Sequence, residues 1–273
     1  MRPMPSYVIV ALLALAFVAP SAHAELKSKE IEYKHGDTTL LGYLVWDDSP
    51  SVGKRPGVVV VHEWMGHNDY VRRRANMLAK LGYAAFALDM YGKGVKAKDP
   101  QEAGQMAGRF KNDRKLMRER AQAGLDVLKK QSMVDTSRIG AMGYCFGGQV
   151  ALELGRSGAD LKGIVSFHGA LDTPTPDDAK NIKAKVLACH GSADPFVPLE
   201  HVRDFIQEME NGKVDYRVIA YGPGVVHGFT NPDNKNSKMQ GVGYDENADR
   251  RSWEAMRELF DEVFKTGKTA AAR

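Results

Sequence analysis

The stretch that most constrains the fold of this chain runs from Arg138 to Val150 and reads RIGAMGYCFGGQV. Its apolar beginning predicts a buried strand and its glycine-rich end predicts the start of a helix, with Cys145 at the turn between them. Small residues flank this cysteine because a sharp strand-to-helix turn leaves no room for side chains two positions away. A helix N-terminus aimed at the sulfur favours thiolate. The stretch predicts a nucleophile elbow, and a glycine-rich turn around a buried, inert cysteine is the alternative.

Residues 1–24 have the pattern of a secretory signal peptide. Arg2 is their only charged residue, Tyr7 to Val18 is an apolar run of 12 residues, and Ala22-His23-Ala24 forms an A-x-A cleavage site. The apolar run is short for a bilayer span, so an uncleaved membrane anchor is the less favoured alternative. We expect export to the periplasm or the medium, with a mature chain that starts at Glu25 and no stable membrane association after cleavage.

The remaining residues, 25–273, have the length of one large α/β domain and can bury a substantial core. The formal net charge of the whole chain is only +4. Its longest basic run, Arg72-Arg73-Arg74, sits in a helical pattern, and the chain has no basic tract with interleaved aromatics that would indicate a nucleic-acid partner. We find no internal repeat, linker or low-complexity segment. We therefore expect a single domain that acts as a monomer on a small molecule.

The chain has two cysteines, Cys145 and Cys189. In an exported protein two cysteines often form a disulfide. Cys189, however, lies inside an apolar strand pattern, and a disulfide would consume the proposed nucleophile. We expect two free thiols, one reactive and one buried, with the disulfide as the alternative.

The hydrophobic periodicity predicts strands that alternate with helices after an N-terminal β-hairpin. The expected strands are the two arms of a hairpin within 29–46, and 56–63, 83–88, 138–144, 162–167, 185–189 and 214–221; the expected helices cover about 68–81, 113–131, 147 onward, 199–209 and 245–265, with a short helix near 101–110. Almost continuous β-branched runs, such as PGVVVVHE at 56–63, suit strands that are buried on both faces of a parallel sheet. The pattern predicts an α/β fold with a mostly parallel central sheet flanked by helices on both faces. We expect the irregular segment 91–113 to form a lid or pocket wall.

A cysteine nucleophile needs a base, and the base needs a third group to orient it. In doubly wound sheets such groups occupy loops at the carboxyl ends of strands. Asp194 follows the strand at 185–189, and His227 follows the last strand in a glycine-rich loop. The order Cys145, Asp194, His227 is the order nucleophile, acid, histidine of α/β-hydrolases. The other candidates for the acid are Asp172, Asp177 and Asp178, which follow the preceding strand.

Glu63 is the second unusual feature, because it ends the buried valine run. A carboxylate at the carboxyl end of a central strand should lie at the active-site edge of the sheet, and a solvent-facing loop residue is the alternative. Trp64, the next residue, has its backbone N–H where a second oxyanion donor is needed. The first such donor would be the N–H of Phe146, directly after the proposed nucleophile.

Together these features resemble the dienelactone hydrolase family of α/β-hydrolases, over roughly residues 31–264. The matching motifs are HEWMG at 62–66, LDMYG at 88–92, RIGAMGYCFGG at 138–148, HGSADPFVP at 190–198 and HGF at 227–229. The resemblance implies the α/β-hydrolase fold and a Cys–His–Asp triad at Cys145, His227 and Asp194. It also implies that Glu63 pairs with the resting thiol, which is then largely neutral, until substrate displaces it. The expected activity is hydrolysis of a small ester or lactone, with no metal or cofactor.

The chain departs from the family where arginines hold a substrate carboxylate. Gly92 and Lys93 stand at one such place, and Thr230 and Asn231 stand at the other. Lys93 could replace one charge, without the bidentate geometry of arginine. Dienelactone itself is therefore not the expected substrate. The candidates for substrate contact are Tyr91, Lys93 and Phe229. The alternatives to an ester or lactone hydrolase are a thioesterase or acyl transferase with the same triad, and a catalytically silent binding protein.

Overall fold

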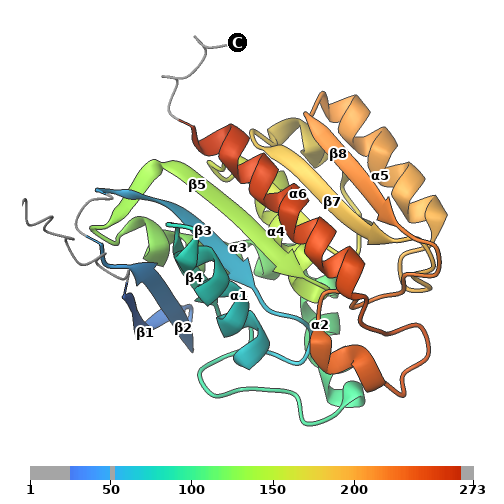
Figure 1. Ribbon diagram of the computed structural model, residues 1–273, viewed down its shortest axis with the longest axis horizontal. Helices are drawn as coiled ribbons and strands as arrows, with labels where there is room; N and C mark the ends of the chain where they lie inside the picture. The colour runs from blue at the N-terminus through green and yellow to red at the C-terminus, as the bar shows by residue number, and fades with distance from the viewer. Residues whose placement is uncertain (1–24, 50–52, 266–273) are drawn as a thin grey trace, which may run out of the picture.

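The computed structural model describes residues 25–49 and 53–265 (Figure 1). The proposed signal peptide, residues 1–24, lies outside the described residues. The described strands form one sheet of eight, in the spatial order β1-β2-β4-β3-β5-β6-β7-β8. These strands are β1 (Leu26–His35), β2 (Thr38–Asp47), β3 (Arg55–Val61), β4 (Ala84–Leu88), β5 (Val134–Tyr144), β6 (Gly163–Phe167), β7 (Lys185–Gly191) and β8 (Tyr216–Tyr221). The expected α/β-hydrolase fold is confirmed.

Strand direction divides the sheet into two parts. β1 and β2 form the expected antiparallel hairpin, whose turn contains Gly36 at a φ of +55°, and β2 runs antiparallel to β4. From β4 through β3, β5, β6, β7 and β8 every neighbouring pair is parallel. The carboxyl ends of these six strands therefore meet at one edge of the sheet, and the loops that leave them gather there.

Helices cover both faces of the sheet, as the continuous apolar strands require. They are α1 (Asp69–Lys80), α2 (Pro100–Asn112), α3 (Arg114–Lys129), α4 (Phe146–Arg156), α5 (Leu199–Gly212) and α6 (Glu246–Phe264), with short 3-10 helices η2 (Pro176–Asn181) and η3 (Pro232–Asn236). Helices α1 and α6 pack on one face and α3 and α4 on the other, each over its own apolar core (Figure 1). Within the described residues, no helix combines the length and the apolar character needed to cross a membrane.

The segment 91–113 is more regular than the sequence prediction. The Asp99 carboxylate caps α2 by accepting from the backbone N–H of Glu102 at 2.8 Å, and Pro100 occupies the first turn. Both are strong start signals for a helix, and they extend α2 to 13 residues. Asp113 then caps α3 by accepting from the N–H of Leu116 at 2.9 Å. Most of this segment is therefore a helix packed beside α3, and not an irregular lid.

A buried ion network holds α4, the helix that follows the proposed nucleophile. Glu153 and Arg156 of α4 have fully buried side chains. The Arg156 guanidinium donates two hydrogen bonds of 2.7 Å to Glu208 of α5, and Arg118 of α3 donates to Glu153 at 2.7 Å. Because removing one partner of a buried pair leaves an uncompensated charge, these contacts fix α4 against its neighbours.

Candidate active site

Cys145 sits at the sharp turn that the sequence predicts, between β5 and α4. Its φ is +54° and its ψ is −118°, a backbone conformation that side-chain-bearing residues seldom adopt. The glycines on either side are required by space. A Cβ atom at Gly143 would lie 2.0 Å from the carbonyl oxygen of Gly147, and one at Gly147 would lie 2.3 Å from the carbonyl oxygen of Val61. The turn therefore presses the start of α4 against β5 and β3 and projects the sulfur from the carboxyl edge of the sheet.

Asp194 and His227 come together at the same edge, from the loops after β7 and β8. Asp194 is 5% exposed, and one of its carboxylate oxygens lies 2.8 Å from Nδ1 of His227. Its other oxygen accepts from the N–H of Phe196 at 2.8 Å, which fixes the carboxylate. Burial alone would lower the pKa of His227, but the adjacent Cys145 sulfur and the Asp194 carboxylate raise it to about 10. The arrangement favours a protonated, cationic imidazole beside the Cys145 sulfur.

Phe146 and Trp64 are the predicted oxyanion donors, and both lie at the pocket. In the described chain neither Phe146 nor Trp64 donates its N–H to a backbone carbonyl, and both residues line the same pocket as Cys145. Phe146 begins α4, so its N–H also carries the partial positive charge of the helix N-terminus. The carbonyl of Trp64 accepts a 2.9 Å hydrogen bond from the Tyr91 hydroxyl, which restrains the peptide between Trp64 and Met65.

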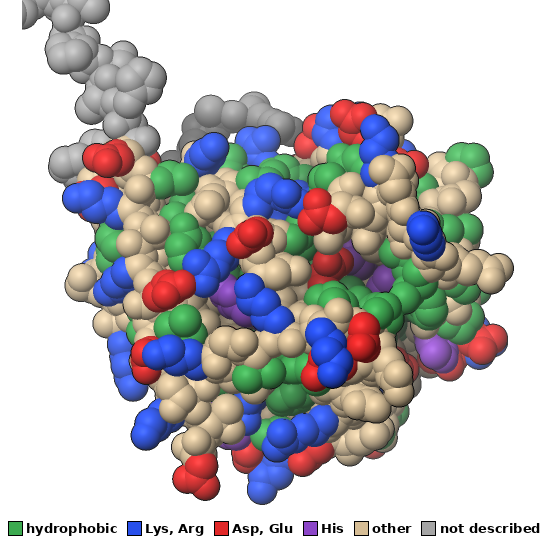
Figure 2. Space-filling view, turned by 90° about the horizontal axis from the view of Figure 1, so that it is seen from below, with side chains coloured by type: hydrophobic (Ala, Val, Ile, Leu, Met, Phe, Trp, Pro, Cys, Tyr) green, Lys and Arg blue, Asp and Glu red, His purple; other side chains and the backbone are tan. Residues whose placement is uncertain are grey.

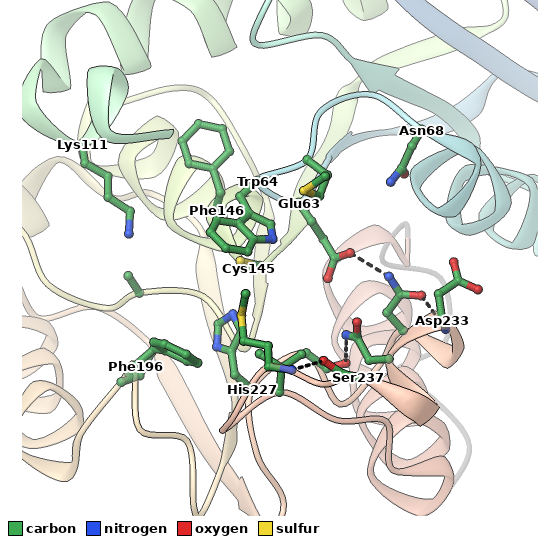
Figure 3. Close-up of a pocket in the computed structure, with 18 residues that line it drawn as sticks. Glu63, Trp64, Asn68, Lys111, Cys145, Phe146, Phe196, His227, Asp233 and Ser237 are labelled. Atoms are coloured by element: carbon green, nitrogen blue, oxygen red, sulfur yellow. Dashed lines mark hydrogen bonds between the residues drawn. The ribbon is translucent and has the colours of Figure 1, made fainter. Parts of the chain in front are cut away.

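Glu63 faces the pocket from the end of β3, but its carboxylate is bound to an amide. Oε2 of Glu63 accepts a 2.8 Å hydrogen bond from Nδ2 of Asn231, and Figure 3 shows the carboxylate directed away from Cys145 toward this amide. Burial raises the pKa of Glu63, and the bond from Asn231 opposes this rise. Among the described residues no hydrogen bond joins Glu63 to the thiol. The structure thus holds Glu63 in a different position from the thiol-bound one that the family resemblance implies.

These residues surround a pocket of about 410 Å³. The lining residues are Glu63, Trp64, Met65, Asn68, Lys111, Cys145, Phe146, Ala170, Phe196, Val197, His227, Gly228, Asn231, Asp233, Asn234, Ser237, Met239 and Val242. Figure 2 views the molecule from below Figure 1, and acidic and histidine side chains show inside a hollow bordered by hydrophobic ones. A pocket of this size and mixed lining is typical of a site for a small molecule.

The model of the dienelactone hydrolase family matches residues 40–264 of this sequence. This chain belongs to the dienelactone hydrolase family. As a dienelactone hydrolase-like protein it is a hydrolase. Four of the five family motifs found in the sequence, all except LDMYG at 88–92, contribute residues to the pocket at the carboxyl edge of the sheet.

Solved structures and curated proteins agree with this membership. The chain is 44% identical to a solved structure named m3DLH, with a TM-score of 0.85 over 88% of this chain and 99% of that one. It is 41% identical to a dienelactone hydrolase-like promiscuous phosphotriesterase from metagenomic libraries, with a TM-score of 0.83 and the same coverage. A putative carboxymethylenebutenolidase of Synechocystis sp. is 25% identical, over 88% of this chain and 99% of its own.

The three candidates for substrate contact, Tyr91, Lys93 and Phe229, are not among the residues that line the pocket of this dienelactone hydrolase family member. The Lys93 ammonium is paired with Glu32 of β1 at the surface. Tyr91 stacks on Phe110 and supports the Trp64 carbonyl from behind. Phe229 is fully buried against other aromatic rings. Each lies in or directly after a family motif, and membership of a motif does not determine the direction of a side chain.

Lys111 is the lysine of the pocket lining, and no motif in the sequence indicated it. It lies in the last turn of α2, and Figure 3 shows it on the opposite side of Cys145 from Glu63. Among the described residues it forms no ion pair with a carboxylate of the protein. Asn231, the N-cap of η3, and Asn234, within η3, are further polar groups of the wall that motif spacing could not assign. No group of three or more potential metal ligands was found in the described part of the chain.

The two cysteines are free in the structure and differ in environment. Cys145 is partly exposed in the pocket, whereas Cys189 of β7 is 2% exposed. Burial raises the pKa of the Cys189 thiol to about 12, so almost none of it is thiolate below pH 9. We expect iodoacetamide at pH 8 to add one label to the native protein and two to the unfolded protein, by mass spectrometry. A Cys189→Ala control should give one label in both states, and an unfolded, unreduced protein that takes no label would contradict the free thiols.

Proposed function

We propose that this protein is an exported hydrolase of small esters or lactones that works through an acyl-cysteine intermediate. The observation that carries the proposal is the convergence of Cys145, the Asp194–His227 pair and two free backbone N–H groups on one pocket. A nucleophile, an oriented base and an oxyanion site are the three components that acyl transfer requires.

The proposed reaction has two halves. The Cys145 thiolate attacks the carbonyl carbon, and the N–H groups of Phe146 and Trp64 bind the oxyanion. The tetrahedral intermediate expels the alcohol oxygen, which takes the proton of the His227 imidazolium and leaves a thioester. His227, held by Asp194, then removes a proton from water as that water attacks the thioester. Collapse releases the acid and restores the thiolate and the imidazolium.

The pocket supports a small, partly polar substrate. Its volume is about 410 Å³, and its wall alternates apolar side chains such as Trp64 and Met239 with the amides of Asn68, Asn231 and Asn234. Related proteins are named as putative carboxymethylenebutenolidases, which makes an unsaturated lactone one substrate to test. Lys111 is the only cationic side chain of the lining apart from His227, so we propose that it faces a carboxylate or ester oxygen of the substrate.

The relative at 41% identity, named a promiscuous phosphotriesterase, favours a second candidate activity. In that reaction the same thiolate would attack phosphorus, expel an alkoxide or phenoxide and form a thiophosphate ester, which water would then cleave. A nitrophenyl phosphotriester should be tested beside nitrophenyl acetate and a lactone panel. The substrate with the higher kcat/KM then identifies the main activity. A preference for thioesters would indicate a thioesterase. Faster turnover with an added alcohol acceptor would indicate an acyl transferase.

The intermediate provides the direct test. We expect protein quenched in acid within the first turnovers with nitrophenyl acetate to carry one acetyl group, located at Cys145 by peptide mass spectrometry. His227→Ala should acylate slowly and deacylate more slowly still, because His227 supplies a proton to the leaving group in the first step and removes one from water in the second. Turnover without any adduct at Cys145 would reject covalent catalysis, and no turnover of any tested ester, lactone, thioester or phosphotriester would support the silent binding protein.

We also propose export with cleavage after Ala24, on the strength of the sequence pattern in residues 1–24. Edman sequencing of the protein recovered from the periplasm of an expressing bacterium should begin at Glu25. Recovery of the intact N-terminus from the cytoplasm would reject the proposal.

The bond between Asn231 and Glu63 gives a further prediction. In Asn231→Leu the Glu63 carboxylate loses its 2.8 Å partner, and we expect it to turn to the thiol and stabilise the protonated sulfur. Alkylation of Cys145 at pH 7 should then slow by roughly fivefold, as a change of about 1 kcal/mol would produce. Adding Glu63→Gln should restore the rate, because the amide carries no charge. Equal rates in wild type, single and double variants would show that Glu63 does not control the thiol.

A further inference from the structure

We propose that His168 and Thr230 form a positioning bridge that sets the nucleophile turn against the loop of His227. The inference rests on the proposed function, since it takes Cys145 as the nucleophile and His227 as its base. His168 follows β6 and Thr230 lies three residues beyond His227, so the bridge connects two loops that are far apart in the sequence. Neither residue lines the pocket, and neither is needed as an acid, a base or a nucleophile.

The first half of the bridge holds the backbone of the nucleophile. The N–H of Cys145 donates to the carbonyl of Phe167 at 3.0 Å and to Nδ1 of His168 at 3.2 Å. An N–H can donate only to an unprotonated nitrogen, so the proton of the neutral His168 ring must be on Nε2. His168 itself has a φ of +41°, in the left-handed region, and is 1% exposed. Two strained residues are thus joined directly, and each restrains the other.

The second half of the bridge uses the proton on Nε2 to reach Thr230. Nε2 of His168 lies 2.8 Å from the hydroxyl oxygen of Thr230, to which it donates. The Tyr70 hydroxyl lies 2.6 Å from the same oxygen, and it accepts from Nε of Arg74 at 3.2 Å. Because the cationic Arg74 can only donate, the Tyr70 proton is directed to Thr230. The Thr230 oxygen therefore accepts from Tyr70, and it also accepts from Nε2 of His168, because the Cys145 N–H on Nδ1 leaves the ring proton on Nε2.

The Thr230 backbone is held as firmly as its side chain. Arg74 donates through Nη2 to the carbonyl of Thr230 at 2.5 Å and to the carboxylate of Asp249 on α6 at 2.5 Å. The His168 ring also packs edge-on against the ring of His227, with centroids 5.1 Å apart. Burial lowers the pKa of His168 well below its usual range, and the charges of His227 and Arg74 lower it further, so the ring stays neutral beside the imidazolium.

The bridge has a consequence for the reaction. Two hydrogen bonds lead from the backbone of Cys145 to the segment that carries His227, and the same segment carries Asn231, the partner of Glu63. The distance between sulfur and imidazole is therefore set by groups outside the pocket. Because small displacements of reacting groups can cost about 10²-fold in rate, loss of the bridge should lower kcat and leave substrate binding almost unchanged.

Thr230→Val tests the bridge, because valine preserves the shape of the side chain and removes its oxygen. Thr230→Ser is the matched control, because serine keeps the hydroxyl. We expect Thr230→Val to lower kcat by about 10-fold to 100-fold with KM within about twofold, and to shift the pH profile of Cys145 alkylation. Thr230→Ser should regain most of the rate and the wild-type pH profile. A folded Thr230→Val with unchanged kcat and alkylation profile, or equal losses in both variants, would overturn the proposal.

If Thr230→Val does not fold, His168→Asn provides the test of the bridge. Asparagine tolerates a positive φ and offers an acceptor to the N–H of Cys145, but it cannot reach Thr230 as the imidazole does. A kcat about tenfold lower at unchanged KM supports the bridge, and wild-type kcat overturns it. The proposed function is tested separately by Cys145→Ala. If Cys145→Ala keeps full activity, the nucleophile assignment itself is wrong, whatever the other variants do.

Discussion

Cys145→Ala is expected to abolish turnover, with kcat falling by about 10⁴-fold or more, because removal of a covalent nucleophile disables both halves of the reaction. The variant should keep its fold and its affinity for substrate, since alanine removes one sulfur atom from a partly exposed position. Initial rates with nitrophenyl acetate and a lactone panel, together with thermal unfolding, measure both effects. The residual rate would report the contribution of the oxyanion donors Phe146 and Trp64 alone.

Cys189→Ala is the matched control for this experiment. Cys189 is buried in β7, and its sulfur has only a weak contact, 3.8 Å, with the Tyr221 hydroxyl. Its replacement should leave kcat within about twofold of wild type and cost roughly 1 kcal/mol of stability through the small cavity. If Cys145→Ala and Cys189→Ala lose activity to the same extent, the effect is one of folding, and the nucleophile must be sought elsewhere.

Gly143→Ala is expected to have the second largest effect, on stability and activity together. The added Cβ would lie 2.0 Å from the carbonyl oxygen of Gly147 and 2.8 Å from the backbone nitrogen of Gly148, and neither belongs to a flexible side chain. The start of α4 must move to accept it, which carries the Phe146 N–H and the sulfur out of place. Overpacking of this kind costs about 1–3 kcal/mol or more, and the misplacement should lower kcat at least 10²-fold.

Gly104→Ala provides the same chemical change where the opposite result is expected. Gly104 is exposed in α2, and a Cβ there would meet no atom within 4 Å. Alanine should therefore stabilise the protein by about 0.5–1 kcal/mol through its helix propensity, with no change in kcat. Urea unfolding of both variants gives the comparison. A Gly143→Ala protein as stable and active as Gly104→Ala would show that the turn at Cys145 relaxes easily.

The sequence was informative where local rules determine structure. The strand, turn and helix around Cys145 follow from glycine spacing. The meeting of Cys145, Asp194 and His227 follows from the way parallel strands bring their carboxyl ends to one edge. The buried valine run placed Glu63 and Trp64 at that edge, beside the pocket. Each of these inferences needed only the position of a residue relative to the end of its own strand.

Side-chain direction and long-range pairing were beyond such rules. Lys93 was expected near the substrate, but its pairing with Glu32 of β1 depends on how the hairpin packs. The bond between Glu63 and Asn231 spans 168 positions in the sequence, and no periodicity relates two such residues. Lys111 reaches the pocket because Asp99 and Pro100 start α2 early enough for its last turn to end there. These features arise from the packed structure as a whole.

The pocket wall has a consequence for how such a protein could change during evolution. Of the 18 lining residues, eight lie in one stretch from His227 to Val242, which returns to pair with the backbone of His227 through Gly241 and Gly243. Beyond its first residue, this stretch contributes no member of the Cys145–Asp194–His227 group. Insertions or substitutions between residues 232 and 240 could therefore reshape the cavity for a new acyl or phosphoryl group, while the Cys145–Asp194–His227 group is left unchanged.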